Sequence, residues 1–428
     1  MAHLIPFAAL PFLQAGPGPA IRAWLARLLS GLVPEGMIDL LVNLVMWVVI
    51  ATVIILVVQI AMLYSTWLER KFIGRIQDRI GPNRVGKFGL LQPFADMVKM
   101  LTKEDITPTP SHRWVYNLGA IMVVPPALLV FAVVPAGIGL IATDLSVGFL
   151  FFIAVASTAV IPIFMAGWGS RNKYALLGAM RAVAQIVSYE IPQVLSVAGV
   201  LLLAGTMSMQ GLTVNQGPLD MTNAAAANYP GVWFVLLQPI AFFIFLIATT
   251  AEIERTPFDV PEAESEIIAG YHTEYAGIKF GMFYLALYFQ TISASALAVV
   301  LFLGGWQPPL AVLGFVPGWI WFSLKTFAMV LVFMWLRGTL PRLRVDQLMS
   351  FSWKILVPVA LVNLMVTGFV TNYTFNAHSS PIMVFAAFAV ANAAILALTL
   401  FLAARLQAQQ QARAIHFDAP TSVAEGPA

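Results

Sequence analysis

Seven carboxylates lie close together in a chain that is otherwise nearly free of charge. The protein is 60% hydrophobic and only 10% charged. Crowded carboxylates raise one another's pKa values, and partial removal from water raises them further. Some members of the group could therefore hold protons near neutral pH, as a proton-handling site requires. The seven are Glu252, Glu254, Asp259, Glu262, Glu264, Glu266 and Glu274.

A water-exposed acidic loop is the ordinary alternative for such a stretch. Here, however, apolar residues such as Ile253, Phe258 and Ile267 stand between the acids. Glu252 and Glu254 also close a hydrophobic segment, and Pro257 follows directly. The mixture of acids with large apolar side chains indicates partial burial, so we favour a proton-handling site.

Three further ionisable residues fall inside long hydrophobic segments. Arg181 and Glu190 are separated by about 13 Å along a helix, too far to pair with each other. Lys325 lies in another apolar run and could either face the interior or extend toward an interface. A charge in hydrocarbon costs at least about 2.5–3.5 kcal/mol and usually has a function. Arg181 and Glu190 must therefore each find another partner or face water, and the position of Lys325 favours the interior. A buried structural carboxylate is the alternative for Glu190.

Composition places these residues in a membrane protein. The 428 residues include 30 Phe and 11 Trp, and long runs carry no charge. There is no cysteine, which excludes structural disulfides, cysteine-held iron–sulfur clusters and cysteine nucleophiles within this chain. The sequence also lacks a Gly-rich phosphate loop, a dinucleotide fingerprint, a His-Glu metal motif and a basic run for nucleic acid. We expect no metal site and no bound nucleic acid.

Hydropathy predicts an all-α polytopic fold with about nine transmembrane helices. Basic residues concentrate in alternate connections; residues 69–115 hold nine Lys or Arg, whereas 205–230 hold none. This alternation predicts that the N terminus lies outside and the C terminus in the cytoplasm. The first span lies between Asp39 and Glu69, and the others lie near 116–136, 145–166, 175–204, 231–251, 280–304, 319–336, 355–373 and 382–404.

The first cytoplasmic loop contains a candidate amphipathic helix. Leu91, Phe94 or Ala95, Val98 and Leu101 share one helical face, which could lie on the membrane or against neighbouring spans. The loop's arginines and lysines could be ordinary membrane anchors or a fixed cationic rim for a polar head group or partner. We expect three parts in the chain: an N-terminal extension at 1–40, a membrane domain at 41–373, and an additional span with a polar tail at 374–428.

Four blocks of this sequence resemble the H subunit of the proton-pumping NADH-quinone oxidoreductase, respiratory complex I, which is the family of the first mitochondrially encoded complex I subunit. The blocks follow the family's order, and the similarity covers roughly residues 45–370. The N-terminal extension and the material after about 375 depart from shorter members. The blocks are 256-TPFDVPEAESEIIAGYHTEYAG-277, 69-ERKFIGRIQDRIGPNRVGKFGLLQPFADMVKMLTKE-104, 174-YALLGAMRAVAQIVSYE-190 and 341-PRLRVDQLM-349.

The resemblance implies a subunit of an enzyme complex in the cell inner membrane, inactive alone. Such subunits form much of the chamber through which lipid quinone, the substrate, reaches an iron–sulfur cluster of neighbouring subunits. FMN and the iron–sulfur clusters are expected in partners, which are the hydrophilic quinone-site subunits and the membrane-arm subunits. By motif, Arg70, Arg79, Asp96, Phe258 and Asp259 belong to the chamber and its rim. The coupling residues would be Glu252, Glu254, Glu262, Glu264 and Glu266, continued by Glu190, Arg181 and Lys325, while Asp346 would help to fix the cytoplasmic junction.

Two other functions remain open on the sequence. The chain could serve a related hydrogenase or a quinone reductase with another electron donor, which the accompanying proteins would reveal. A stand-alone proton-coupled transporter is the other class, and such a protein would be functional without soluble partners.

Overall fold

The computed structural model describes residues 35–217, 232–260, 268–376 and 381–417, and these are mainly helical. Within those ranges the backbone forms no β-strand and a single isolated bridge, between Gly137 and Leu140. The predicted all-α membrane fold is confirmed. The acidic residues Glu262, Glu264 and Glu266 and most of the N-terminal extension lie outside the described residues.

Eight helical units in the described part of the chain are long and apolar enough to cross a membrane. Prolines divide two of them, because proline lacks the N–H that a continuous helix needs. These units are α3 (Glu35–Ile76); α5 (Arg113–Met122) with α6 (Val124–Leu129) and η3 (Val130–Val133); α7 (Gly148–Ser157) with α8 (Val160–Gly169); α9 (Lys173–Ala204); α14 (Gly277–Phe302); α15 (Gly318–Thr339); α16 (Val345–Phe351) running through the π-turn η6 (Ser352–Leu356) into α17 (Val357–Asn376); and α18 (Pro381–Phe417).

The expected fifth span differs from the prediction of one continuous helix. The chain forms the short helix α11 (Phe234–Leu237), breaks at Gln238 with φ −132° and ψ 61°, and resumes as α12 (Pro239–Glu252). Pro239 supplies no backbone N–H, so it starts the second piece. The 14 residues of α12 reach about 21 Å, which is shorter than the roughly 30 Å hydrocarbon core. Glu252 is the last residue of this short helix.

The shorter helices lie in the connections between the spans. The predicted amphipathic helix is present as α4 (Gln92–Thr102), and Leu91, Phe94, Val98 and Leu101 are all exposed on it or beside its start. An exposed apolar face fits a helix that lies on the membrane. The others are η2 (Lys87–Gly89), α10 (Met209–Val214), η4 (Gly270–His272) and η5 (Ala311–Phe315).

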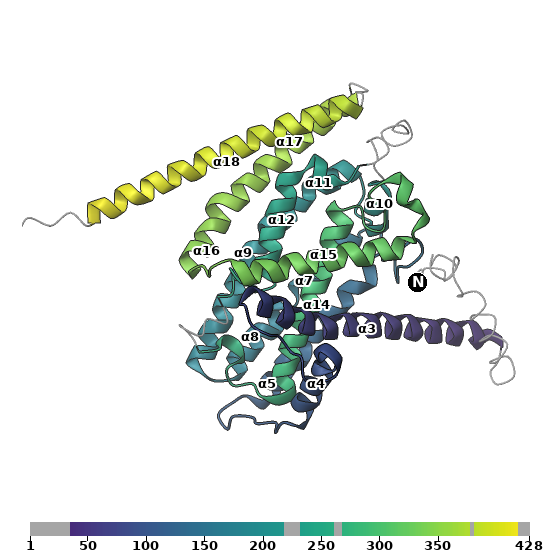
Figure 1. Cartoon of the computed structure of the whole chain (residues 1–428), viewed down its shortest axis with the longest axis vertical. Coiled ribbons are helices and arrows are strands. Elements are labelled where there is room, and N and C mark those ends of the chain that lie inside the picture. Colours follow the sequence, from purple (N-terminus) through teal and green to yellow (C-terminus); the bar gives the residue numbers. More distant parts are fainter. Residues whose placement is uncertain (1–34, 218–231, 261–267, 377–380, 418–428) are drawn as a thin grey trace, which may run out of the picture.

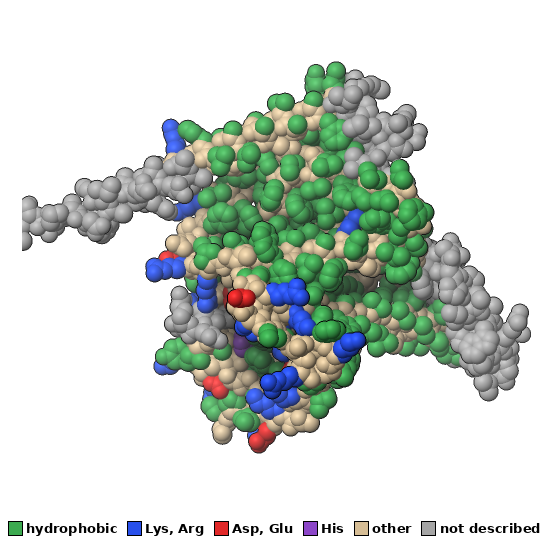
Figure 2. All heavy atoms as spheres, in the orientation of Figure 1, with side chains coloured by type: hydrophobic (Ala, Val, Ile, Leu, Met, Phe, Trp, Pro, Cys, Tyr) green, Lys and Arg blue, Asp and Glu red, His purple; other side chains and the backbone are tan. Residues whose placement is uncertain are grey.

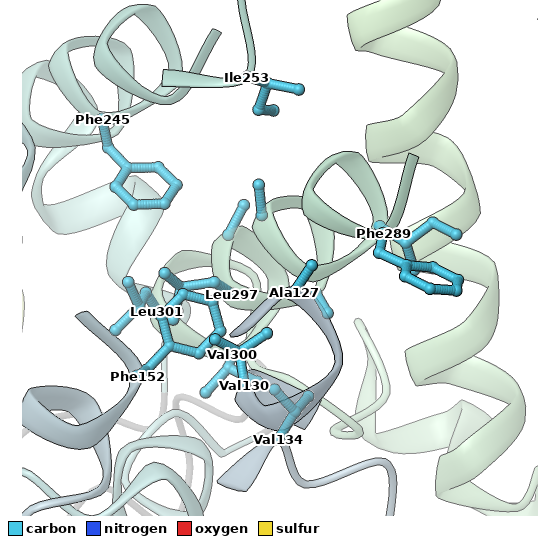
Figure 3. Close-up of a cluster of buried hydrophobic side chains, with 14 of the residues drawn as sticks. Ala127, Val130, Val134, Phe152, Phe245, Ile253, Phe289, Leu297, Val300 and Leu301 are labelled. Carbon is cyan, nitrogen blue, oxygen red and sulfur yellow. The ribbon is translucent and has the colours of Figure 1, made fainter. Parts of the chain in front are cut away.

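Helices α9 and α14 form the centre of the bundle. Helix α9 packs against α8, α12 and α17, and α14 packs against α3, α6 and α15. In the apolar window of α14, 78% of the residues are buried. Side chains of α14 such as Leu297 and Leu301 meet Val130 and Phe152 from the preceding helices (Figure 3). This core fixes the helices that carry the ionisable residues.

The surface separates into an apolar part and a basic part. Helices α17 and α18 run side by side at one edge, and α3 extends away from the bundle (Figure 1). Side chains such as Phe369 and Met365 are exposed on α17. Most Lys and Arg side chains in Figure 2 gather in the lower half of the view, around α4 and α5, while the upper half is largely hydrophobic. An apolar surface of this extent is expected for a protein that contacts lipid.

Candidate functional site

A cavity of about 920 Å³ lies between α3, α4, the α5–α6 unit, α14 and α15. Most of its wall is apolar, with residues such as Met62, Val124 and Phe280. Its charged lining residues come from the ends of α3 and α15 and from the first loop: Glu69, Arg70, Arg79, Asp96 and Arg337. The cavity therefore suits a ligand that combines a polar head group with a hydrocarbon tail.

The loop residues that the sequence assigned to a chamber line this cavity. The Arg70 Nη1 atom is 2.6 Å from a carboxylate oxygen of Asp96, and Gln92 donates to the other oxygen of Asp96 at 3.1 Å. Arg79 donates to Gln77 at 2.7 Å. The side chain of Arg70 is 53% exposed and that of Asp96 is 24% exposed. This ion pair thus lies at the rim, where its donors remain accessible.

A buried ion cluster closes the polar end of the cavity. Glu69 is 2% exposed, and one of its oxygens accepts from Arg255 at 2.5 Å and also from Arg337. The guanidinium of Arg255, which is 4% exposed, stacks 4.8 Å from the ring centre of Tyr288. One carboxylate therefore joins α3, the loop after α12, and α15. Two guanidinium groups share its charge.

The sequence patterns assigned no role to Glu69, Arg255 or Arg337. Glu69 was visible only as the charge that ends the first hydrophobic run, and Arg337 had the position of an ordinary basic anchor. Arg255 was the one arginine at the start of the acidic stretch. A single arginine in an acidic stretch is expected to form an ion pair, and this was the sequence signal that could have pointed to Arg255.

The described part of the acidic stretch adjoins the cavity without lining it. Glu254 and Asp259 line a smaller polar cavity that shares Tyr284, Tyr288 and Arg337 with the large one. Glu254 is 7% exposed and accepts from the Tyr271 hydroxyl at 3.2 Å. The φ of Glu254 is +55°, a conformation that L-residues other than Asn and Asp rarely adopt. Neighbouring contacts must hold this residue in place.

The carboxylates of Glu190 on α9 and Glu252 at the end of α12 are each held by a hydrogen bond. Glu252 accepts from the Gln193 amide at 2.6 Å, and the same amide donates to the Thr249 hydroxyl at 3.2 Å. Glu190 accepts from the Ser157 hydroxyl. Because α9 and α12 pack against each other, the two carboxylates lie on neighbouring helices. Together with Glu254 they could accept and pass protons.

Several other candidate residues lie apart from the cavity. Phe258 packs against Tyr189 at 5.5 Å between ring centres. Arg181 is half-buried on α9, and Asp346 lies in the first turn of α16. In the described ranges no three His, Asp or Glu residues are grouped to hold a metal ion.

Lys325 also lies apart from the acids that the sequence grouped with it. It donates to three main-chain oxygens beyond the end of α14, those of Leu303, Gly305 and Gln307. Its Nζ is 4.2 Å from the ring centre of Trp233. The fold thus surrounds Lys325 with carbonyl groups.

His272 is a buried titratable group next to the site. Its ring packs edge-on against Tyr271 and Phe280. Burial lowers the pKa of His272 to about 4, and the charge of Asp259 opposes that shift only in part. The ring is therefore neutral in the folded protein at physiological pH.

Replacing His272 with glutamine is expected to remove part of the acid sensitivity of the protein. The unfolded histidine takes a proton near pH 6.5 whereas the folded ring does so near pH 4, so the stabilising effect of the neutral ring is complete above 6.5 and lost as pH falls toward 4. The loss should reach about 2 kcal/mol by pH 5. Thermal unfolding of the purified complex at pH 7 and pH 5 measures it, with the exposed His112→Gln as control. An equal loss in H272Q and wild type would contradict the prediction.

Comparisons with known proteins agree on one family. Residues 48–368 match the family described as NADH dehydrogenase. The NADH-quinone oxidoreductase H subunit of Dehalococcoides mccartyi (strain ATCC BAA-2266 / KCTC 15142 / 195) is 50% identical over 333 residues, covering 78% of this chain and 88% of that protein. The H subunit numbered 2 of Geobacter sulfurreducens is 47% identical over 316 residues (72% and 91%), and the H subunit of Geobacillus kaustophilus is 46% identical over 334 residues (78% and 96%).

Proposed function

Because this chain belongs to the NADH dehydrogenase family, as a membrane subunit of NADH-quinone oxidoreductase, we propose that it forms much of the quinone chamber and couples quinone reduction to proton translocation. It is a multi-pass part of an enzyme complex, respiratory complex I, and other subunits of that complex are its partners. The chamber and the proton path are the proposed part, and the cavity and the buried carboxylates support them.

The observation that carries the proposal is the cavity of about 920 Å³ with apolar walls and one charged end. A lipid quinone has a flat polar head and an isoprenoid tail, so it matches both parts. The tail would lie along Met62, Met97 and Leu128. The head would lie toward Arg70 and Arg337, whose guanidinium groups can donate to quinone oxygens. Electrons would arrive from an iron–sulfur cluster in a partner subunit.

Proton balance links the cavity to the carboxylates. Reduction of one quinone to quinol takes up two electrons and two protons, so the head group changes both its charge and its proton demand. Glu254 and Asp259 lie in the polar cavity that shares Arg337 and Tyr288 with the chamber. We propose that protons and charge pass from there to Glu252 and Glu190, and that the change biases distant membrane-arm subunits.

The remaining assignments belong to the same proposal. Glu262, Glu264 and Glu266 would extend the acidic path on the cytoplasmic side, and Arg181 would extend it within the membrane. Lys325, held by carbonyl groups beyond the end of α14, would stand outside this path. FMN and iron–sulfur clusters would reside in hydrophilic partner subunits. The chain would lie in the cell inner membrane with its N terminus outside and its C terminus in the cytoplasm. Residues 41–373 would form the family domain, flanked by an extension at 1–40 and an extra span with its tail at 374–428.

A labelled quinone tests the chamber directly. The complex is purified in mild detergent through a tag on this chain, checked for NADH-to-quinone activity, and irradiated with a photoreactive quinone analogue. We expect labelled peptides from α3, α4 and α14, and loss of the label when excess natural quinone competes. Labelling confined to other subunits, in a preparation that still reduces quinone, would overturn the chamber assignment.

A further inference from the structure

A single glutamine on α9 holds both ends of the loop that joins the cavity to the intramembrane carboxylates. The Gln185 amide nitrogen donates to the carbonyl oxygen of Ala251 and to that of Phe258, both at 2.7 Å. Gln185 is 1% exposed. Ala251 lies in the last turn of α12, and Phe258 lies beyond the loop. The two hydrogen bonds therefore close residues 251–258 into a ring anchored on α9.

The loop inside this ring carries the groups that the proposed path needs. Glu252 bonds to Gln193, Glu254 faces the small polar cavity, and Arg255 reaches Glu69 on the wall of the large cavity. The directions in which these three side chains point depend on the backbone of the short loop. That backbone has an unfavourable φ of +55° at Glu254. Such a conformation persists only when the surroundings impose it. The two bonds from Gln185 are contacts that fix both loop ends to one helix.

A second residue one turn along α9 supports the same end of the loop. The Tyr189 ring packs on Phe258, and its hydroxyl donates to the carbonyl of Leu348 in α16. Gln185 and Tyr189 stand four positions apart and so share one helical face. That face also leads to Gln193, four positions further, which holds Glu252. The path thus rests against one row of polar side chains on α9.

We propose that Gln185 is a positioning residue for energy coupling, which holds loop 251–258 so that Glu252 and Glu254 stay between the quinone cavity and Glu190. An amide suits this role because one nitrogen carries two hydrogens and can bridge two carbonyl groups without adding charge. Leucine has a similar size but no donor. Gln185 does not line the cavity, so it acts on the loop and not on quinone. This inference rests on the proposed function, since it concerns the same carboxylates.

Gln216 provides a matched control. It is also fully buried, and its amide nitrogen also donates to two carbonyl groups, those of Leu212 and Val300. Its carbonyl oxygen accepts from the backbone N–H of Gly304, just beyond α14. These bonds lie at the C-terminal end of α14, whereas the coupling loop follows α12. Leucine at position 216 removes the same chemistry from the bundle without touching the loop.

The test compares Gln185→Leu and Gln216→Leu in the intact complex. Assembly is measured by NADH-to-ferricyanide activity, which bypasses quinone, and coupling by quinone kinetics and proton uptake in vesicles. For Q185L we expect an unchanged quinone KM and a kcat and proton flux lower by on the order of tenfold. Q216L should retain both rates per assembled complex. A normal rate in Q185L, a raised KM with normal kcat, or equal losses in both variants would overturn the proposal.

Gln185→Glu keeps the test decisive if Q185L fails to assemble. A carboxylate cannot donate to the two carbonyls, whereas a protonated carboxyl restores one of the bonds. We expect the ratio of mutant to wild-type turnover to rise as the pH is lowered, and a ratio that does not change with pH would overturn the proposal. Glu252→Gln, measured alongside, separates the two hypotheses. Pumping by E252Q with a defect in Q185L would refute the proton path, whereas the reverse pattern would refute the role of Gln185 alone.

Discussion

Glu69→Gln is expected to destabilise the complex more than any other single charge change in this chain. The substitution leaves Arg255 and Arg337 without the carboxylate that they share. Arg255 is 4% exposed, so its buried charge would lose its carboxylate partner. Removing one partner from a buried ion pair typically costs about 3–5 kcal/mol. The expected results are a lower amount of assembled complex in the membrane and a lower unfolding temperature of what remains.

Asp96→Asn is the matched comparison for that prediction. It removes the carboxylate of the Arg70–Asp96 pair in the same cavity, but this pair lies at the rim with a half-exposed arginine. Exposed ion pairs contribute about 0–1 kcal/mol. Thermal unfolding of the two variant complexes, measured in the same detergent, separates the two cases. Equal stability of E69Q and D96N would show that the buried cluster does not hold α3, α15 and the loop together.

Glu252→Gln is expected to have the largest effect on coupling. The amide preserves the size of the side chain and keeps an acceptor for Gln193, so the packing of α12 on α9 should survive. It removes the group that, in the proposed path, exchanges a proton with Glu190. Loss of an essential proton-transferring group usually lowers a rate by on the order of a hundredfold or more. Quinone-linked proton translocation should therefore fall sharply while assembly and quinone affinity stay close to normal.

Glu274→Gln is the control for this second prediction. Glu274 is also an acid of the same stretch, but it accepts from Asn172 at 2.6 Å and lines a separate pocket with Arg171 and Lys173. Proton uptake in sealed vesicles, measured per assembled complex, is expected to be normal in E274Q. If E252Q pumps as well as E274Q, the intramembrane carboxylate pair is a structural feature and the proton path runs elsewhere.

The amino-acid sequence alone determined the class of protein, the positions of most spans and the family. Long charge-free runs can satisfy their backbone hydrogen bonds in a membrane only as helices, so hydropathy predicts them well. The span near residues 231–251, which forms no helix long enough to cross the membrane, contains a break at Gln238 before Pro239, and a hydropathy window does not detect such a break. The amphipathic helix α4 was also predictable, because its apolar residues recur with the helical period.

The grouping of the charged residues was decided only by the tertiary structure. Glu69 meets Arg255 and Arg337 across 186 and 268 positions of the chain, and no local period records such a meeting. Lys325 has the same sequence signal as Glu190, a charge within an apolar run, yet the fold surrounds it with carbonyl oxygens at the end of α14. Likewise, Gln185 is an ordinary amide until α12 and its loop pack onto α9. Sequence patterns specify which face of a helix is apolar, but ion pairs and hydrogen bonds between helices depend on which faces meet.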